Sequence, residues 1–193
     1  MTIKFLGHAC FLLTDRRGRR VMIDPYEPDA FGGALHYAPV AEGADVVLVS
    51  HDHADHSYVR GVGGNPTVLR GQGEAGGLGF RATRVPHDHS DGRKRGTSMA
   101  FGTEMDGLAV CHLGDLGGTL APEQVQQIGR VDVLMVPVGG TYTIDADEAQ
   151  GVVDQLLPRV VIPMHYQTGR TSLPLAPVCR FTHGLPGTER PLS

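Results

Sequence analysis

Five potential metal ligands fall within six consecutive residues of this 193-residue chain: His51, Asp52, His53, Asp55 and His56. One residue separates His51 from His53, so on an extended backbone both imidazoles point to the same side and can bind one ion. If the backbone turns directly afterwards, Asp55 and His56 reach the opposite side of the cavity, where they can bind a second ion about 3.5–4 Å away. A solvated polar loop is the alternative, and the density of donors argues against it.

The cluster begins where a buried strand is expected to end. Residues 44–50 form a nearly continuous apolar and β-branched run, which is typical of a strand buried on both faces. Similar patterns predict further strands at residues 2–14, 20–23, 67–69, 79–85, 99–101, 108–113, 131–136 and 160–163. Helices are predicted at 122–128 and 145–157, the second with Asp145 as its N-cap and Pro158 after its end.

The order of these elements predicts the fold class. The chain begins with a β-hairpin whose basic tip, residues 16–19, is interpreted as a solvated turn, and it later changes to strand–helix–strand units. This order favours an α/β sandwich of two mixed β layers with helices on both outer faces. The length and a hydrophobic content of 40% predict a single domain over residues 1–193. The glycine-rich segment 71–79 is a candidate for a flap over the site.

Composition narrows the classes of function. The net charge of −4 arises from 17 basic and 21 acidic residues without a long block of one sign, so nucleic acid is not the favoured partner. Cys10, Cys111 and Cys179 are too few and too far apart for a disulfide framework, which favours a reducing cytoplasm. No apolar run approaches the ~18 residues of a membrane span, so we expect no membrane association. Nothing in the sequence excludes an oligomer.

The histidine cluster resembles the H-x-H-x-D-H signature of the metallo-β-lactamase superfamily, and the other motifs of that family follow in order. They match Asp24, His87, the H-x-G-D sequence that ends in Asp115, and His165. The resemblance runs from Gly7 to about Thr168 and implies the αββα sandwich of that superfamily.

The resemblance also implies a ligand set. The first ion would be held by His51, His53 and His87, the second by Asp55, His56 and His165, and Asp115 would bridge them. Asp24 would orient the metal-binding loop without touching the ions. Imidazole and carboxylate donors suit Zn²⁺, and two ions are expected, with Mn²⁺, Ni²⁺ or Fe as alternatives.

A pair of such ions predicts a hydrolase. Water between two ions becomes acidic enough to attack an ester, a lactone or a phosphodiester, so no side-chain nucleophile is needed. Asp115 would belong to the catalytic machinery as the bridging residue. Asp52 is predicted to hold that water or to move its proton, because it lies within the cluster without being a ligand in the pattern.

Two short segments, residues 6–9 and 163–166, resemble a compact branch of the superfamily that includes ascorbate-6-phosphate lactonase-like proteins. His8, in the first segment, either faces the site or is a strand histidine with a backbone partner. His89 competes with His87 as a ligand, and the family match favours His87. His112 is expected to be structural, and His36 and His183 are expected at the surface.

The basic stretch 93–95 is the candidate for substrate recognition. Arg93, Lys94 or Arg95 could grip a phosphate or carboxylate, which would favour a small anionic substrate; an exposed basic loop is the alternative. Tyr142 and Tyr166 could add hydrogen bonds to the substrate, or they could serve packing alone.

Two other classes of function are weighed against hydrolysis of a small molecule. A nuclease-like enzyme would need a continuous basic groove, which the net charge does not suggest. A non-hydrolytic metal sensor or redox protein would be signalled by a flavin domain or a cysteine pair, and the sequence has neither. The resemblance does not extend to antibiotic hydrolysis, because position 115 lacks the cysteine that some β-lactamases use.

Overall fold

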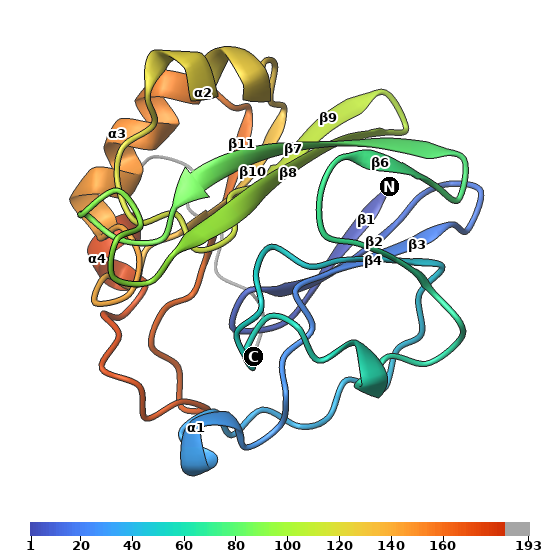
Figure 1. Ribbon diagram of the computed structural model, residues 1–193, viewed down its shortest axis with the longest axis horizontal. Helices are drawn as coiled ribbons and strands as arrows, with labels where there is room; N and C mark the ends of the chain where they lie inside the picture. The colour runs from blue at the N-terminus through green and yellow to red at the C-terminus, as the bar shows by residue number, and fades with distance from the viewer. Residues whose placement is uncertain (184–193) are drawn as a thin grey trace.

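The computed structural model describes residues 1–183 and consists of two mixed β-sheets packed face to face (Figure 1). The predicted fold class is therefore confirmed. Residues 184–193, which belong to the predicted domain range, lie outside the described residues.

The first sheet has the strand order β1-β2-β3-β4-β5. Its strands are β1 (Thr2–Gly7), β2 (Cys10–Thr14), β3 (Arg20–Ile23), β4 (Val46–Leu48) and β5 (Thr67–Leu69). The first three strands are antiparallel neighbours, and β4 and β5 continue parallel to β3.

The second sheet has the order β11-β10-β9-β8-β7-β6. Its strands are β6 (Gly73–Ala75), β7 (Leu78–Pro86), β8 (Thr97–Met105), β9 (Leu108–His112), β10 (Val133–Pro137) and β11 (Val160–Met164). The three strands β9, β10 and β11 are parallel, whereas β6 to β9 form an antiparallel meander.

The main core lies between the two sheets, where alternate residues of each strand face the opposite sheet. Phe11, Leu13 and Leu48 of the first sheet pack in one cluster with Phe101 and Met135 of the second. Because the strands are anchored by this buried cluster, the loops at their ends are held in fixed positions.

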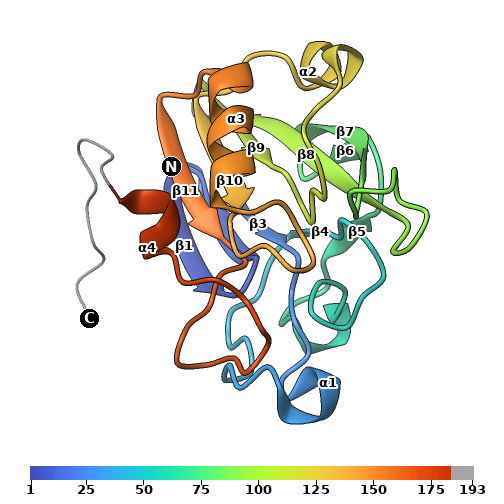
Figure 2. The ribbon, with the colours of Figure 1, turned by 90° about the vertical axis from the view of Figure 1, so that its left-hand side faces the viewer.

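Helices cover the outer face of the second sheet. They are α2 (Pro122–Ile128), α3 (Ala146–Leu156) and α4 (Cys179–Thr182), and α3 lies along the parallel strands (Figure 2). The Asp145 carboxylate accepts the backbone N–H groups of Asp147 and Glu148, both at 3.0 Å, so it is the predicted N-cap of α3.

Loop segments cover most of the outer face of the first sheet. They carry the short helix α1 (Ala30–Gly33) and the 3₁₀ turn η1 (Val59–Gly61). Cys10, Met22 and Val47 of the sheet pack there against Tyr26 and Leu35 of the first loop. The helical cover on this side is thus much shorter than on the other.

Two local predictions were wrong. Residues 2–14 form two strands, because the chain turns back at His8 and pairs Gly7 with Cys10. The glycine-rich segment 71–79 supplies β6 and the start of β7, which form the edge hairpin of the second sheet instead of a flap. No helix within residues 1–183 is long and apolar enough to cross a membrane.

Candidate metal centre

Histidine and aspartate side chains converge where several strands of both sheets end. β4 leads into the cluster that starts at His51, β7 into His87, β9 into Asp115 and β11 into His165. The turn between β1 and β2 adds His8. Residues far apart in the sequence therefore meet because the carboxyl ends of their strands lie together.

The first group of donors consists of His51, His53 and His87, the three residues that the family resemblance assigns to the first ion. Nε2 of His51 lies 3.0 Å from Nδ1 of His53, and Nε2 of His87 lies 3.3 Å from the same atom. The segment 51–56 forms bends and turns, so the two histidines converge without an extended strand. Three imidazole nitrogens that face one point can bind one cation.

The second group consists of His8, Asp55, His56 and His165, and all four residues are buried. Oδ2 of Asp55 lies 3.0 Å from Nε2 of His8 and 3.4 Å from Nε2 of His56. His8 therefore faces the site, which decides between its two alternatives. It joins the three residues predicted for the second ion.

Asp115 lies between the two groups. Its Oδ2 is 3.5 Å from Nε2 of His87 in the first group and 3.5 Å from Nε2 of His165 in the second. Its other oxygen, Oδ1, is 3.3 Å from Nε2 of His56. This is the position that a bridging carboxylate must occupy.

Asp24 fixes the orientation of the cluster through hydrogen bonds to Ser50 and His56. Its carboxylate accepts hydrogen bonds from the backbone N–H and the hydroxyl of Ser50, both at 2.7 Å, and from Nδ1 of His56 at 2.9 Å. Because Nδ1 of His56 donates to Asp24, Nε2 is directed toward Asp55 and Asp115. A carboxylate that fixes the tautomer of a ligating histidine is a common feature of metal sites.

The backbone is strained at three of these residues. His8, Asp24 and His165 have φ values of 55°, 51° and 53°, in the left-handed region that non-glycine residues rarely adopt. The N–H of His165 donates to the carbonyl of His8 at 2.9 Å, so two of the strained residues hold each other. Strain of this kind persists only where the surrounding structure imposes it, and it is common at functional sites.

Burial and charge set the protonation of the cluster. Burial lowers the pKa of His51 to about 4 and that of His165 to about 3, so both imidazoles are neutral near pH 7. Burial alone would also lower the pKa of His56, but the carboxylates of Asp115 and Asp55 outweigh it and raise that pKa. The same carboxylates favour a divalent cation at His56, and binding of the cation would displace the proton.

Unpartnered polar atoms indicate that the residues fit a metal. Nε2 of His56 and one carboxylate oxygen each of Asp55 and Asp115 are fully buried and have no hydrogen-bond partner among the described residues. Such atoms normally carry a cost of about 1–3 kcal/mol each unless a partner satisfies them. Nε2 of His56 and Oδ1 of Asp115 lie 3.3 Å apart, and a cation beside them would satisfy both.

Two predicted site residues lie away from the cluster. The side chain of Asp52 is 80% exposed and pairs with Arg70 instead of facing the metal ligands. His89 is 62% exposed and lies 2.9 Å from Glu148 at the start of α3, so His87 is the histidine that joins the cluster. In a turn, neighbouring side chains diverge, and the alternation of an extended strand does not apply.

The predicted substrate-binding residues lie in three different environments. Tyr166 packs against Phe5, with ring centroids 6.2 Å apart, and belongs to the partly buried apolar side chains. Arg93 is exposed and lies 3.6 Å from Asp91. Arg95 instead places its guanidinium over the ring of Tyr142, 4.6 Å from the centroid.

Other residues support the site from within the fold. Ser50 links Asp24 to Nδ1 of His51 at 2.9 Å, and the hydroxyl of Ser98 accepts the N–H of Asp115 at 3.1 Å. His112 is buried, donates from Nε2 to the carbonyl of Ala9 and accepts the N–H of Gly114 at Nδ1, so it is structural as expected. The sequence could indicate Ser50, which directly precedes the cluster, whereas nothing in it singles out Ser98.

The remaining predictions concern the surface. His36 and His183 are exposed, as expected.

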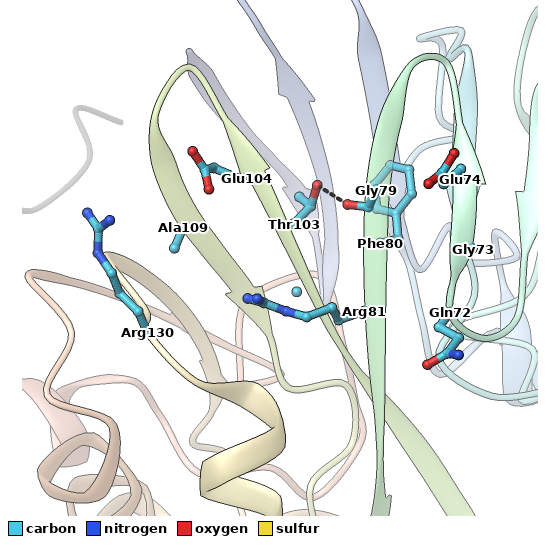
Figure 3. A pocket seen from close by; sticks show the side chains of 11 residues that line it. Gln72, Gly73, Glu74, Gly79, Phe80, Arg81, Thr103, Glu104, Ala109 and Arg130 are labelled. Carbon is cyan, nitrogen blue, oxygen red and sulfur yellow. Dashed lines mark hydrogen bonds between the residues drawn. The ribbon is translucent and has the colours of Figure 1, made fainter.

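A separate groove of about 570 Å³ lies on the second sheet, and Figure 3 shows Arg81 and Arg130 beside it together with Glu74 and Glu104. The groove is lined by none of the predicted site residues and carries charges of both signs.

Comparison with known proteins identifies the family. The beta-lactamase superfamily domain matches residues 2–165. The chain is 31% identical to a UPF0173 metal-dependent hydrolase of Methanoculleus marisnigri, with 87% of this chain and 82% of that protein aligned. This chain belongs to the metallo-β-lactamase superfamily. Within the superfamily it belongs to the UPF0173 metal-dependent hydrolases.

Solved structures agree with this assignment. A protein of Thermotoga maritima, assigned to the Zn-dependent hydrolases of the metallo-β-lactamase superfamily, has 39% identity and a TM-score of 0.75, over 93% of this chain and 83% of that one. A diiron β-hydroxylase from Streptomyces venezuelae shares the fold at 16% identity and a TM-score of 0.59, over 84% of this chain and 44% of that one. The fold alone therefore does not specify the reaction.

Proposed function

We propose that this UPF0173 protein is a hydrolase that uses two divalent metal ions to cleave an ester-type bond: a carboxylic ester, a lactone or a phosphodiester. The observation that carries the proposal is the position of Asp115, whose carboxylate lies within 3.5 Å of His87 on one side and His165 on the other. One carboxylate between two groups of histidines supports a pair of ions.

The donors favour zinc in the first site. His51, His53 and His87 offer three nitrogens and no oxygen, which suits Zn²⁺. The second site adds the carboxylate of Asp55 to three histidines, and this mixed set also accepts Mn²⁺, Ni²⁺ or Fe.

Ions bound here would supply Lewis acidity and would lower the pKa of water, which makes water a nucleophile at neutral pH. The residues around the cluster support this chemistry by offering no competing nucleophile. Cys10 and Cys111 are buried, and burial raises the pKa of both thiols, that of Cys111 to about 12. The hydroxyls of Ser50 and Ser98 are engaged in hydrogen bonds to Asp24 and to the N–H of Asp115.

Asp52 has no part in the proposed machinery, because its side chain faces solvent. The residues that act directly are the metal ligands, and Asp24 positions them through His56 and Ser50. The rings of His8 and His165 are in contact, with centroids 4.1 Å apart. Because these residues come from the two segments that resemble the ascorbate-6-phosphate lactonase-like branch, the contact supports a relationship to that branch.

The experiment combines elemental analysis with a substrate panel. Protein purified without chelator is analysed for metal, reconstituted with Zn²⁺, Mn²⁺, Ni²⁺ or Fe²⁺, and assayed on an aryl ester, a lactone and an aryl phosphodiester. His53→Ala removes a ligand, and His36→Ala removes an exposed histidine outside the cluster as the matched control.

We expect about two equivalents of metal and hydrolysis of at least one substrate. His53→Ala should lower both the metal content and the rate, and His36→Ala should change neither. Wild-type protein that binds no metal, or a metal-loaded protein whose hydrolysis is unaffected by His53→Ala, would refute the proposal.

A further inference from the structure

The loop that follows β7, residues 88–96, is fixed beside the first group of metal ligands. The carboxylate of Asp88 accepts the backbone N–H groups of Ser90, Lys94 and Arg95 at 2.7, 2.9 and 2.8 Å. Burial alone would raise the pKa of Asp88, but these backbone donors outweigh it and lower that pKa, so the carboxylate remains charged. The loop is therefore held from inside by an ionised side chain.

The same loop packs closely on its neighbours. The carbonyl of Gly96 accepts the N–H of His87 at 3.1 Å, which ties the end of the loop to a predicted metal ligand. Gly117 touches the backbone of Asp88 so closely that a Cβ at position 117 would lie 2.2 Å from the Asp88 nitrogen. Arg95, one residue before Gly96, thus projects from a constrained backbone.

The Arg95 side chain joins two loops that each contact a predicted metal ligand. Its guanidinium lies over the ring of Tyr142, in the loop after β10. That loop also contains Gly139, which packs directly on the carbonyl of His165. The contact between Arg95 and Tyr142 therefore connects the loop of His87 with the loop that supports His165. A guanidinium stacked on a ring keeps its N–H groups in the plane of the stack, where they can reach a ligand.

The hydrogen-bonding capacity of Arg95 is unused among the described residues, because no side chain or carbonyl of residues 1–183 accepts a hydrogen bond from its guanidinium within 3.5 Å. The two carboxylates nearest in sequence are engaged elsewhere: Asp88 accepts backbone N–H groups of the loop, and Asp91 lies 3.6 Å from Arg93.

We propose that Arg95, held in place by Tyr142, recognises an anionic group on the substrate. The inference rests on the proposed function and deepens it, because it assigns a substrate class: an ester-type molecule that carries a phosphate or carboxylate apart from the bond to be cleaved. A planar guanidinium binds either group through two parallel hydrogen bonds. Arg93 is exposed like Arg95, but it already lies 3.6 Å from the carboxylate of Asp91.

The test uses two esters that share one leaving group and one acyl chain length and differ in charge: 4-nitrophenyl hexanoate, which is neutral, and mono-4-nitrophenyl adipate, which carries a terminal carboxylate. The variants are Arg95→Ala and Arg95→Lys. Arg84→Ala, at an exposed position on β7, is the matched control because it removes the same charge from a neighbouring surface. The measured quantity is the ratio of kcat/KM for the anionic ester to that for the neutral ester.

Arg95→Ala should lower this ratio about 10- to 100-fold, and Arg95→Lys should lower it less, because lysine keeps the charge without the bidentate geometry. Arg84→Ala should leave the ratio as in the wild type. An Arg95→Ala variant with the wild-type ratio, or one whose ratio matches that of Arg84→Ala, would overturn the proposal.

A second measurement separates this inference from the proposed function. Inorganic phosphate is titrated into metal-loaded wild type, Arg95→Ala and Arg84→Ala by calorimetry. Weaker binding in Arg95→Ala alone, by about tenfold or more, supports anion recognition even if neither ester is cleaved. Equal affinities in all three proteins would mean that Arg95 does not bind anions, whether or not the esters are cleaved.

Discussion

Gly139 lies where the loop after β10 meets the metal ligand His165. A Cβ built at position 139 would lie 2.0 Å from the carbonyl oxygen of His165, whereas real Cβ atoms essentially never approach another heavy atom to within 3.0 Å. Gly139→Ala must therefore separate the two segments by about 1 Å or more. Both contact partners are backbone, so no side-chain rotation can relieve the clash.

The magnitude follows from this displacement. Overpacking of this size costs about 1–3 kcal/mol of unfolding free energy. Displacement of His165 should also lower the affinity for the second metal ion about 10- to 100-fold, as changes to residues that orient metal ligands do. Gly151→Ala is the matched control, because it lies in α3 with no atom within 4 Å of the new Cβ. It should stabilise the helix by about 0.5–1 kcal/mol.

Two assays distinguish these effects. Urea unfolding of metal-free protein gives the change in unfolding free energy, and competition with a chromophoric chelator gives the affinity for each ion. If Gly139→Ala unfolds at the same urea concentration as the wild type and keeps both ions, the close contact does not constrain His165 and the reasoning is refuted.

Three further predictions concern the cluster and the fold. Asp24→Asn should keep the shape of the support under His56 but lose its charge, which weakens metal binding about 10- to 100-fold in a chelator competition; an unchanged affinity would mean that Asp24 only packs. His8→Ala should lower the affinity for the second ion and leave the first bound, as measured by stepwise metal titration; loss of both ions together would contradict separate groups. The N–H of Ala109 and the guanidinium of Arg130 lower the pKa of Asp132, so this carboxylate stabilises the fold above its unfolded pKa of about 3.9, and the stabilisation is lost as the pH falls through the lower folded pKa. Between about pH 5 and about pH 2, the unfolding free energy of metal-free protein, measured with urea, should therefore decline less for Asp132→Asn than for the wild type. Parallel curves would contradict the role of Asp132.

Short sequence patterns were enough to predict several strands and helices and the donor-rich segment of the metal cluster. The buried run that ends at Ser50 predicted β4, and the donors that follow it predicted the metal cluster. The N-cap Asp145 and the following acidic residues predicted where α3 begins, because capping involves only residues three positions apart. The grouping of Asp115 with the histidines came from the family resemblance, since its distance in sequence from His51 carries no physical signal.

The directions of side chains in irregular segments were decided by the tertiary structure. Within the turn at 51–56, Asp52 points to solvent and pairs with Arg70, while Asp55 points inward. No period describes a turn, so residue spacing could not predict which of the two aspartates points inward, and only the family pattern assigned the ligand role to Asp55. His8 reached the site for a similar reason: the chain reverses at positions 7–9, in the middle of a run that reads as one strand.

The sequence by itself thus determined the type of chemistry, because donor atoms and strand ends are properties of short segments. Only the tertiary structure decided which donors lie together and which basic residue stacks on Tyr142. His8 and Asp55 are 47 positions apart, and Arg95 and Tyr142 come from different loops. Contacts of this kind depend on how the two sheets pack. They can stabilise the fold only after the core has brought the loops together.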